Sequence, residues 1–201
     1  MELEQKHPFY TANDYYREIF GEKLIKIAVD GGFTCPNRDG TLSDKGCIFC
    51  SEGGSGDFAA KQCESIKAQT AEAKAKVADK WQNGRYMVYF QAFTNTYAPV
   101  DILREKYTSA LEAADAAALS AATRPDCINR RYKNSVYANA VKMLNGAGID
   151  VVTHIILGLP GETKEDMQNS ADFAVQCGTK GIKLQMLHIL KGTELGRIYK
   201  E

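Results

Sequence analysis

The chain has 201 residues, of which 44% are hydrophobic and 25% charged, and its formal net charge is zero. This is the composition of a globular protein that is long enough to bury one sizeable core. The balanced charge gives no support to a nucleic-acid partner, although it does not exclude one.

The chain has no apolar run near the roughly 18 residues that a membrane-spanning helix needs, and its polar, acidic start does not resemble a signal peptide. We therefore expect a cytoplasmic protein with no membrane partner. Thiols stay reduced in that compartment, so the six cysteines favour metal binding or reactivity over disulfides.

Apolar runs alternate with amphipathic or alanine-rich segments along the chain. The apolar runs predict strands at residues 24–29, 86–91, 116–123, 150–158 and 181–190. The other segments predict helices at residues 10–20, 64–80, 100–115, 135–148 and 163–178. This alternation predicts an α/β fold, with a parallel sheet covered on both faces or a segment of a barrel.

Polar segments follow four of the predicted strands. They are the cysteine loop at 33–51, "QAFTNT" at 91–96, "TRPDC" at 123–127 and "GLPGET" at 158–163. Because binding sites of parallel α/β folds collect at the carboxyl ends of the strands, we expect the functional site to be built from these segments.

Three cysteines lie in the loop "FTCPNRDGTLSDKGCIFCS", whose Pro, Asn, Asp and Gly residues disfavour helix and strand. Cys47 and Cys50 form a C-x-x-C pair that can reach one metal centre from a tight turn, and Cys35 precedes them. Three thiolates suit an iron–sulfur cluster that leaves one iron open to a ligand. A zinc site that recruits Cys63 and a set of incidental thiols are the alternatives that spacing leaves open.

Five ordered blocks of sequence resemble the radical S-adenosylmethionine (SAM) superfamily, and most closely a bacterial subgroup with an Elongator-like radical SAM domain. The blocks are "GGFTCPNRDGTLSDKGCIFCSEGGSGDF", "YFQAFTNTYAPVDILREKY", "SAATRPDC", "THIILGLPGETKEDM" and "GIKLQMLHILKGT". Together the resemblance spans about residues 10 to 200. It implies a partial (β/α) TIM-type barrel of parallel strands.

The resemblance also implies the chemistry. Cys35, Cys47 and Cys50 would ligate three irons of a [4Fe-4S] cluster, and the fourth iron would bind SAM. One electron from the reduced cluster would split SAM into methionine and a 5′-deoxyadenosyl radical, which would abstract hydrogen from an unknown substrate. An electron donor of the flavodoxin or ferredoxin type would be needed. The Elongator kinship points weakly to RNA as the substrate.

Further residues match positions that contact SAM in the superfamily: Phe49, Thr94, Asn95, Ser120, Thr123, Arg124, Gly158, Leu159 and Pro160. Phe49 and the segment 158–160 would lie near adenine, Thr94 and Asn95 near the amino group, and the others near the ribose and carboxylate. Ala92 and Phe93 stand where many members of the superfamily have a glycine pair. No residue is assigned a catalytic role by this resemblance.

The chain departs from the superfamily after Cys127. Members have a further helix and a strand ending in an "ELGLQ"-like segment here, on the order of 40 residues that contribute to the SAM pocket. We therefore expect one radical SAM core domain, residues 1–201, that lacks one helix–strand unit and is truncated at its C-terminus. Loss of a central strand would make its neighbours pair directly or leave unpaired edges. The alternative function is a non-catalytic Fe–S or zinc-binding domain, an inactive shortened relative.

Other residues have structural interpretations. We expect Ile102 on the buried side of its helix, His154 and His188 in the core, and Cys177 as a small buried hydrophobe. The basic run of Arg130, Arg131 and Lys133 would begin a solvated helix.

Overall fold

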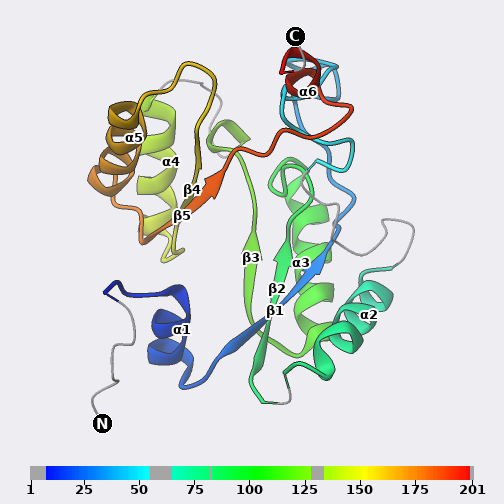
Figure 1. Cartoon of the computed structure of the whole chain (residues 1–201). Coiled ribbons are helices and arrows are strands. Elements are labelled where there is room, and N and C mark those ends of the chain that lie inside the picture. The colour runs from blue at the N-terminus through cyan, green and yellow to red at the C-terminus, as the bar shows by residue number, and fades with distance from the viewer. Residues whose placement is uncertain (1–7, 55–64, 82, 128–133, 200–201) are drawn as a thin grey trace. The chain divides into compact units, whose positions relative to one another are not determined.

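The computed structural model describes residues 8–54, 65–81, 83–127 and 134–199, which form a mixed α/β fold (Figure 1). Its strands are β1 (Leu24–Val29), β2 (Arg85–Phe90), β3 (Ala116–Ala121), β4 (Val152–Leu157) and β5 (Gly181–Met186). Its α-helices are α1 (Ala12–Phe20), α2 (Ile66–Ala78), α3 (Val100–Ala114), α4 (Asn134–Gly146), α5 (Lys164–Gln176) and α6 (Glu194–Ile198), with a short 3-10 helix at Pro125–Cys127. Each predicted strand and helix is present. Sequence reasoning missed α6 and the 3-10 turn.

The strands pair in parallel, as predicted, but in two sheets. One sheet has the order β1-β2-β3 and the other contains β4 and β5. Strand pairing thus stops at β3 and resumes at β4. The described residues of 1–42 and 53–123 form one compact unit, and those of 43–52 and 124–201 form another. The prediction of one domain stays a prediction.

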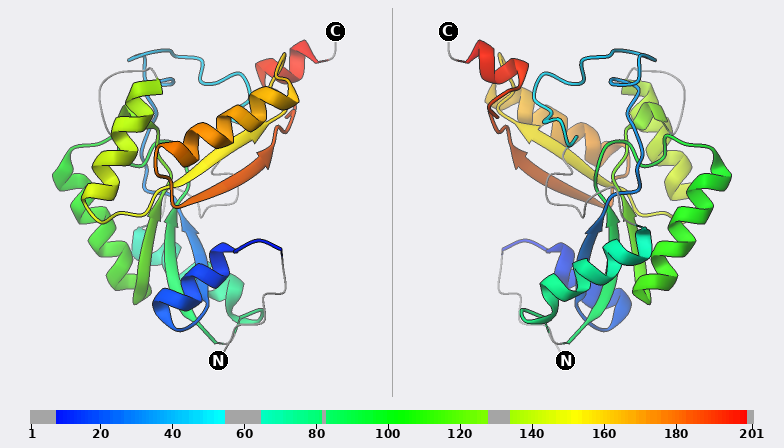
Figure 2. Two further views of the ribbon diagram at one scale, coloured as in Figure 1. Left: turned by 90° about the vertical axis from the view of Figure 1, so that its left-hand side faces the viewer. Right: turned by 90° about the vertical axis from the view of Figure 1, so that its right-hand side faces the viewer.

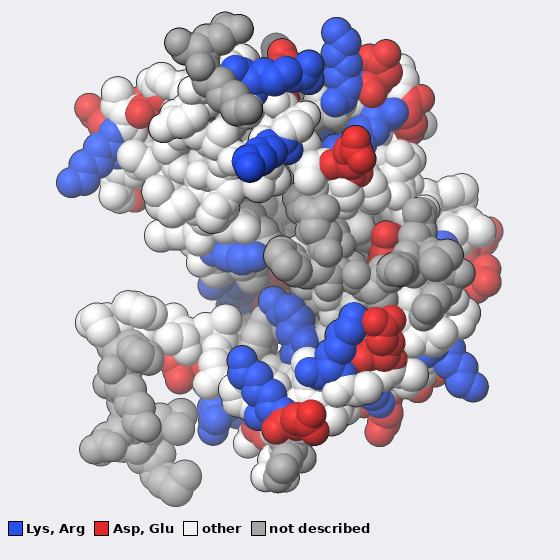
Figure 3. Space-filling model, turned by 45° about the vertical axis from the view of Figure 1, so that its right-hand side comes forward, with Lys and Arg blue, Asp and Glu red and all other residues white. Residues whose placement is uncertain are grey.

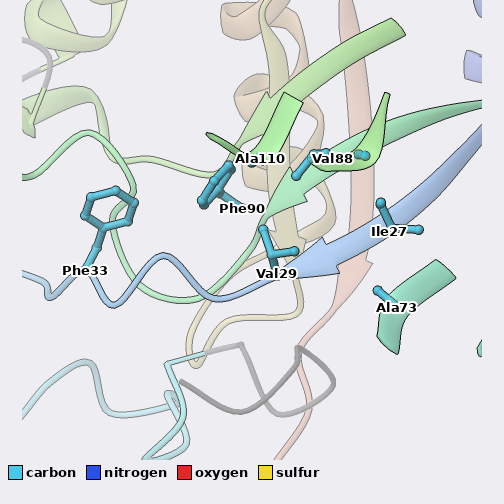
Figure 4. Packing of buried hydrophobic residues seen from close by; sticks show 8 residues of the cluster. Ile27, Val29, Phe33, Ala73, Val88, Phe90 and Ala110 are labelled. Atoms are coloured by element: carbon cyan, nitrogen blue, oxygen red, sulfur yellow. The ribbon is translucent and has the colours of Figure 1, made fainter. Parts of the chain in front are cut away.

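The core of the first unit lies between its sheet and helices α2 and α3. Buried side chains from all these elements meet there (Figure 4): Ile27, Val29, Phe33, Ala73, Val88, Phe90, Ala110 and Ala114. Alanine on the helices allows them to approach the sheet closely, and the aromatic rings of Phe33, Phe90 and Tyr107 contact one another with centroid distances of 5.0 to 6.4 Å. Because β1, β2 and β3 pair in parallel, their carboxyl ends lie at the same end of the sheet (Figure 2).

Capping residues set the starts of α1 and α5. Thr11 and Asp14 form a capping box at the start of α1. Thr163 and Asp166 form a second capping box at the start of α5. In each box the threonine side chain accepts a backbone N–H while the aspartate bonds back to the threonine backbone, which satisfies donors that the helix start leaves unpaired.

In the second unit, a chain of hydroxyl groups joins helix α4 to the sheet. The Tyr137 hydroxyl bonds to Thr153, and Thr153 bonds to Thr179 at 2.8 Å. The ring of Tyr137 also contacts Phe173 of α5. Strand β5 is largely exposed, with Leu184 at 60% and Met186 at 66%. The expectation of a sheet covered on both faces is therefore wrong for β5, although its apolar composition is that of a buried strand.

The structural interpretations of Ile102, His154 and His188 are wrong as well. Ile102 is 41% exposed, because α3 turns Ala110 and Ala114 rather than Ile102 towards the sheet. His154 and His188 are exposed, because they belong to the β4–β5 region whose residues are mostly accessible. Cys177 is half-buried at the end of α5, and burial raises the pKa of its thiol. Cys63, Arg130, Arg131 and Lys133 lie outside the described residues.

Both acidic and basic side chains lie on the face drawn in Figure 3. This distribution agrees with the zero net charge of the sequence. Within the described part of the chain, no helix is long and apolar enough to cross a membrane.

The core predicts unequal effects for two apolar truncations. Phe90→Ala should lower the free energy of unfolding by about 3–5 kcal/mol, because a fully buried ring is lost and a cavity remains. Ile102→Ala should change it by less than about 0.5 kcal/mol, because this side chain is substantially exposed. Urea unfolding followed by circular dichroism measures both, and equal losses would contradict this description of the core.

Candidate functional site

The loops that follow β2 and β3 are joined by the side chain of Asn95. Its amide nitrogen donates to the carbonyl oxygens of Phe90, at 3.0 Å, and Ala122, at 2.8 Å. The backbone N–H of Asn95 also donates to Ala122, at 3.0 Å. The Ala122 N–H also donates to the Phe90 carbonyl, at 2.9 Å, so the Asn95 amide adds a second bond to that acceptor at the end of the sheet where a site is expected.

The oxygen of this side-chain amide, in contrast to its nitrogen, has no partner in the described structure. Asn95 is fully buried, and its Oδ1 atom has no hydrogen-bond partner among the residues that the structure describes. Rotation of the amide would not remove the problem, because the nitrogen is already fixed by two carbonyl acceptors. A buried acceptor of this kind is costly, so the position is suited to a donor group from outside the described residues.

Tyr107 of α3 also holds the loop that follows β2. Its hydroxyl donates to the backbone carbonyl of Asn95. Burial raises the pKa of Tyr107 to about 12, so that the hydroxyl keeps its proton and remains a donor well above neutral pH. The core helix α3 thereby positions a residue of the candidate site.

The backbone at Phe93 has a conformation that is unusual for a residue other than glycine. Its φ is 59°, in the left-handed region that suits glycine. The Phe93 N–H donates to the carbonyl of Gly54 at 3.1 Å. A Cβ added to Gly54 would lie 2.4 Å from the Phe93 ring, so this glycine makes room for it. The backbone at Phe93 therefore has a glycine-like conformation, and its ring packs against Gly54.

Turns and backbone hydrogen bonds order the first part of the cysteine loop. The Cys35 carbonyl accepts from the N–H groups of Arg38, at 2.8 Å, and Asp39, at 3.2 Å. Hydrogen bonds from the Thr41 side chain and backbone lower the pKa of Asp39. The N–H of Thr94 donates to the Thr34 carbonyl at 3.2 Å, which ties the loop after β1 to the loop after β2. As predicted, residues 33–51 contain neither helix nor strand.

Gln69 of α2 fixes the point where β1 ends and this loop begins. It is 1% exposed, accepts from the Asp30 N–H at 2.8 Å, and donates to the Asp30 carbonyl at 3.0 Å. The side chain thus replaces a missing strand partner at Asp30. Sequence reasoning predicted the helix at 64–80 but missed this contact.

The C-x-x-C pair belongs to the second unit, and α6 holds it there. The N–H of Cys50 donates to the Cys47 carbonyl at 3.0 Å, which closes the turn. The N–H of Leu195 donates to the Ile48 carbonyl, inside the turn, at 2.9 Å. Thr193 caps α6 by accepting from the Gly196 N–H at 3.0 Å. The threonine at the start of "TELGR" is the one sequence signal that could have revealed this helix.

A tight turn follows β4 at the segment "GLPGE". The Glu162 carboxylate accepts from the N–H groups of Gly158, at 2.8 Å, and Leu159, at 3.0 Å. Gly158 and Gly161 have φ values of 84° and 80°, which explains why glycine stands at both positions. Gly158, Leu159 and Pro160 are exposed at the carboxyl end of β4.

The predicted site residues therefore fall into two sets. Cys35, Thr94, Asn95, Ser120 and Thr123 belong to the first unit, and their loops are linked by the bonds described above. Cys47, Phe49, Cys50, Arg124, Gly158, Leu159 and Pro160 belong to the second. The three candidate metal ligands are half-buried. The described residues include no group of three or more His, Cys, Asp or Glu side chains gathered as for a metal ion.

Comparison with known proteins identifies relatives that match nearly the whole chain. YtqA of Bacillus subtilis (strain 168), an uncharacterized protein, is 40% identical over 227 residues, which cover 96% of this chain and 70% of YtqA. YhcC of Escherichia coli (strain K12) is 32% identical over 216 residues, which cover 90% of this chain and 69% of YhcC. The uncharacterized protein MJ0486 of Methanocaldococcus jannaschii is 29% identical over 222 residues and is covered to 67%. No protein-family model matches the chain.

The alignment with YtqA is longer than this chain, at 227 against 201 residues. Part of YtqA inside the aligned region therefore has no counterpart here.

Removal of the Tyr107 hydroxyl should destabilise the protein in a pH-dependent way. Tyr107→Phe should lose about 1 kcal/mol at neutral pH, because the Asn95 carbonyl loses a buried donor. The pKa of Tyr107 is raised from 10.0 to about 12, so its contribution is complete below pH 10 and declines as the pH rises towards 12. The stability difference between wild type and variant should shrink over that range. Tyr199→Phe is the control, because Tyr199 is 74% exposed.

Removal of the α6 cap should loosen the C-x-x-C turn. Thr193→Ala should destabilise α6 by about 1 kcal/mol and accelerate hydrogen exchange at the amides of Leu195 and Cys50. Thr163→Ala removes an equivalent cap from α5, in the same unit, and should leave exchange at Cys50 unchanged. Unchanged exchange at Cys50 in Thr193→Ala would show that α6 does not hold the turn.

Proposed function

This chain belongs to the family of YtqA and YhcC, and we propose that it is a radical SAM enzyme with a [4Fe-4S] cluster. It would cleave SAM reductively and act on an unknown substrate, for which RNA is a candidate that charge does not support. The parallel strands of the two sheets would belong to a partial TIM-type barrel. The observation that carries the proposal is the set of three thiols in a loop that directly follows the first parallel strand.

The chemistry of the donor set fits the cluster. Thiolates of Cys35, Cys47 and Cys50 would ligate three irons, and the position without a thiolate would remain for SAM. The surrounding loop is built from turns and backbone hydrogen bonds rather than from a hydrophobic core. Such a loop gains cross-links when its thiolates share one inorganic group.

The unpaired oxygen of Asn95 supports the SAM part of the proposal. SAM carries an ammonium group and ribose hydroxyls, and each of these can donate a hydrogen bond to a buried amide oxygen. A charge-assisted bond from the ammonium group would offset the cost of burying this acceptor. Thr94, which is 1% exposed, lies beside Asn95 in the same turn. These two residues match the stretch that holds the amino group in the superfamily.

The remaining SAM contacts are proposed from the resemblance and from their positions on the chain. Thr123, which bonds to Thr96 through its hydroxyl, ends the loop after β3, and Ser120 lies in β3 itself. Their hydroxyls would serve the ribose and carboxylate together with Arg124. Phe49 and the segment 158–160 would pack near adenine, where an aromatic ring and a turn without bulky side chains suit a flat base.

With both groups bound, the cluster supplies the electron that cleaves SAM into methionine and a 5′-deoxyadenosyl radical. The residues of this chain have the tasks of binding, orientation and exclusion of water. Asn95 and Thr94 would orient the amino-acid end of SAM, and the hydroxyl groups would orient its ribose. An electron donor of flavodoxin or ferredoxin type would supply the reductant.

The alternative is a non-catalytic Fe–S or zinc-binding domain. It is favoured by the segment of YtqA that has no counterpart here, and by strand pairing that stops at β3 and resumes at β4. If the absent segment is the helix–strand unit that ends in "ELGLQ", part of the SAM pocket would be missing. A cluster could then be retained while SAM binds weakly.

The decisive experiment combines metal analysis and product analysis on protein purified without oxygen. The protein should contain about four irons per chain and, with dithionite and SAM, should release 5′-deoxyadenosine. Cys47→Ala should abolish both the iron and the product. Cys177→Ala is the matched control and should retain both, because Cys177 ends helix α5 outside the cysteine loop.

The outcomes separate the two functions. Iron without 5′-deoxyadenosine would favour the non-catalytic Fe–S domain, and a colourless protein with zinc would favour the zinc-binding domain. Protein without bound metal would contradict both. An insertion of the corresponding YtqA segment should restore product formation if the shortened pocket is the cause of inactivity.

A further inference from the structure

One lysine interrupts an otherwise buried or half-buried strand. Strand β1 reads "LIKIAV", and Lys26 is its one exposed residue among buried or half-buried neighbours. Lys26 is accessible, and its side chain lies over the Tyr89 ring rather than in the core cluster. It therefore places a positive charge on the sheet face that looks away from the core cluster.

The strand register shows which side chains share the sheet face with Lys26. The face that looks away from the core cluster carries one row formed by Lys26, Met87 and Ala118, and a second row formed by Ala28, Tyr89 and Ser120. Tyr89 thus stands between two small residues in the second row. The polar side chains that this register places on the face are Arg85, Lys26, Tyr89 and Ser120, and Arg85 lies at the start of β2, opposite Leu24.

Lys26 and Tyr89 form a pair across the two rows. The Lys26 Nζ atom lies 4.7 Å from the centroid of the Tyr89 ring. Tyr89 is only 8% exposed, and burial raises the pKa of its hydroxyl, which therefore stays protonated as a donor. An ammonium group and a phenol hydroxyl together suit an oxygen anion, to which the first offers charge and the second a hydrogen bond.

We propose that Lys26 and Tyr89 form a subsite for an oxyanion of the substrate, a phosphate or a carboxylate. That the bound anion is part of a substrate rests on the proposed function. That Lys26 and Tyr89 bind an anion does not depend on it. Tyr89 is paired with Ser120, the predicted ribose contact. It is also the residue before the last residue of β2, which the loop with Thr94 and Asn95 follows. A substrate held at this level of the sheet would adjoin the cofactor rather than overlap with it.

The test uses the full chain without a cluster, with inorganic pyrophosphate and malonate as probes at equal ionic strength. Chemical acetylation of lysines is followed by mass spectrometry. One or both anions should slow acetylation of Lys26 at least about threefold, and the anion that protects identifies phosphate or carboxylate as the group. Lys74 is the matched control, because its Nζ lies 4.6 Å from the Tyr86 ring, which packs against the core on the other face.

Variants test the two residues separately by calorimetric titration with the anion that protects. Lys26→Gln should weaken binding at least about tenfold, because a charged partner is lost. Lys26→Arg should stay within about threefold, because it keeps the charge. Tyr89→Phe should weaken binding about fivefold, and Lys74→Gln should have no effect. Urea unfolding of each variant verifies that it is folded.

Absence of protection at Lys26, or equal protection of Lys26 and Lys74, would overturn the subsite. So would unchanged binding in Lys26→Gln. This failure is distinct from failure of the proposed function. Protection without 5′-deoxyadenosine release would leave the anion subsite standing and remove the radical chemistry, and release without protection would do the reverse.

Discussion

The buried amide of Asn95 is the interaction on which the candidate site of the first unit depends. The loops that leave the carboxyl ends of parallel strands need contacts that hold them together, and their backbone polar groups need hydrogen-bond partners. Asn95 donates to the ends of β2 and β3 at once, and α3 holds its own carbonyl through Tyr107. The hydrophobic core and the site are thus joined by hydrogen bonds that all involve Asn95, as donor to the strand ends and as acceptor from Tyr107.

Burial of the Asn95 Oδ1 atom also lowers the stability of the fold, because no described residue donates a hydrogen bond to it. An unpaired buried acceptor opposes folding by about 1–3 kcal/mol, and such costs persist in proteins mainly where function uses them. The left-handed φ of Phe93, two residues before Asn95, is a second unfavourable feature of this turn. Both features fall in the loop after β2, where a parallel α/β fold collects its binding groups.

The cysteine loop follows a different principle. Gln69 holds its start at the end of β1, the turns after Cys35 order its middle, and α6 holds the C-x-x-C turn through Leu195 and Ile48. Each of these contacts is a hydrogen bond to the backbone of the loop or of its first residues rather than an apolar contact. Backbone bonds can fix the path of a loop while leaving its thiol side chains available for a shared ligand. The face of the first sheet that looks away from its core adds an ammonium group and a phenol hydroxyl, from Lys26 and Tyr89.

Local patterns in the sequence determined the order of strands and helices, the parallel arrangement, the irregular cysteine loop and the capping box at α5. These features depend on residues close together in the chain, whose periodicity and turn chemistry can be read directly. Tertiary structure alone decided that Gln69 faces Asp30, that Tyr107 donates to Asn95, and that α6 holds Ile48. It also decided that β5 is exposed and that strand pairing is divided into two sheets. The reason is that each of these outcomes depends on which distant backbone groups meet, and a strand such as "GIKLQM" has the same composition whether or not another element covers it.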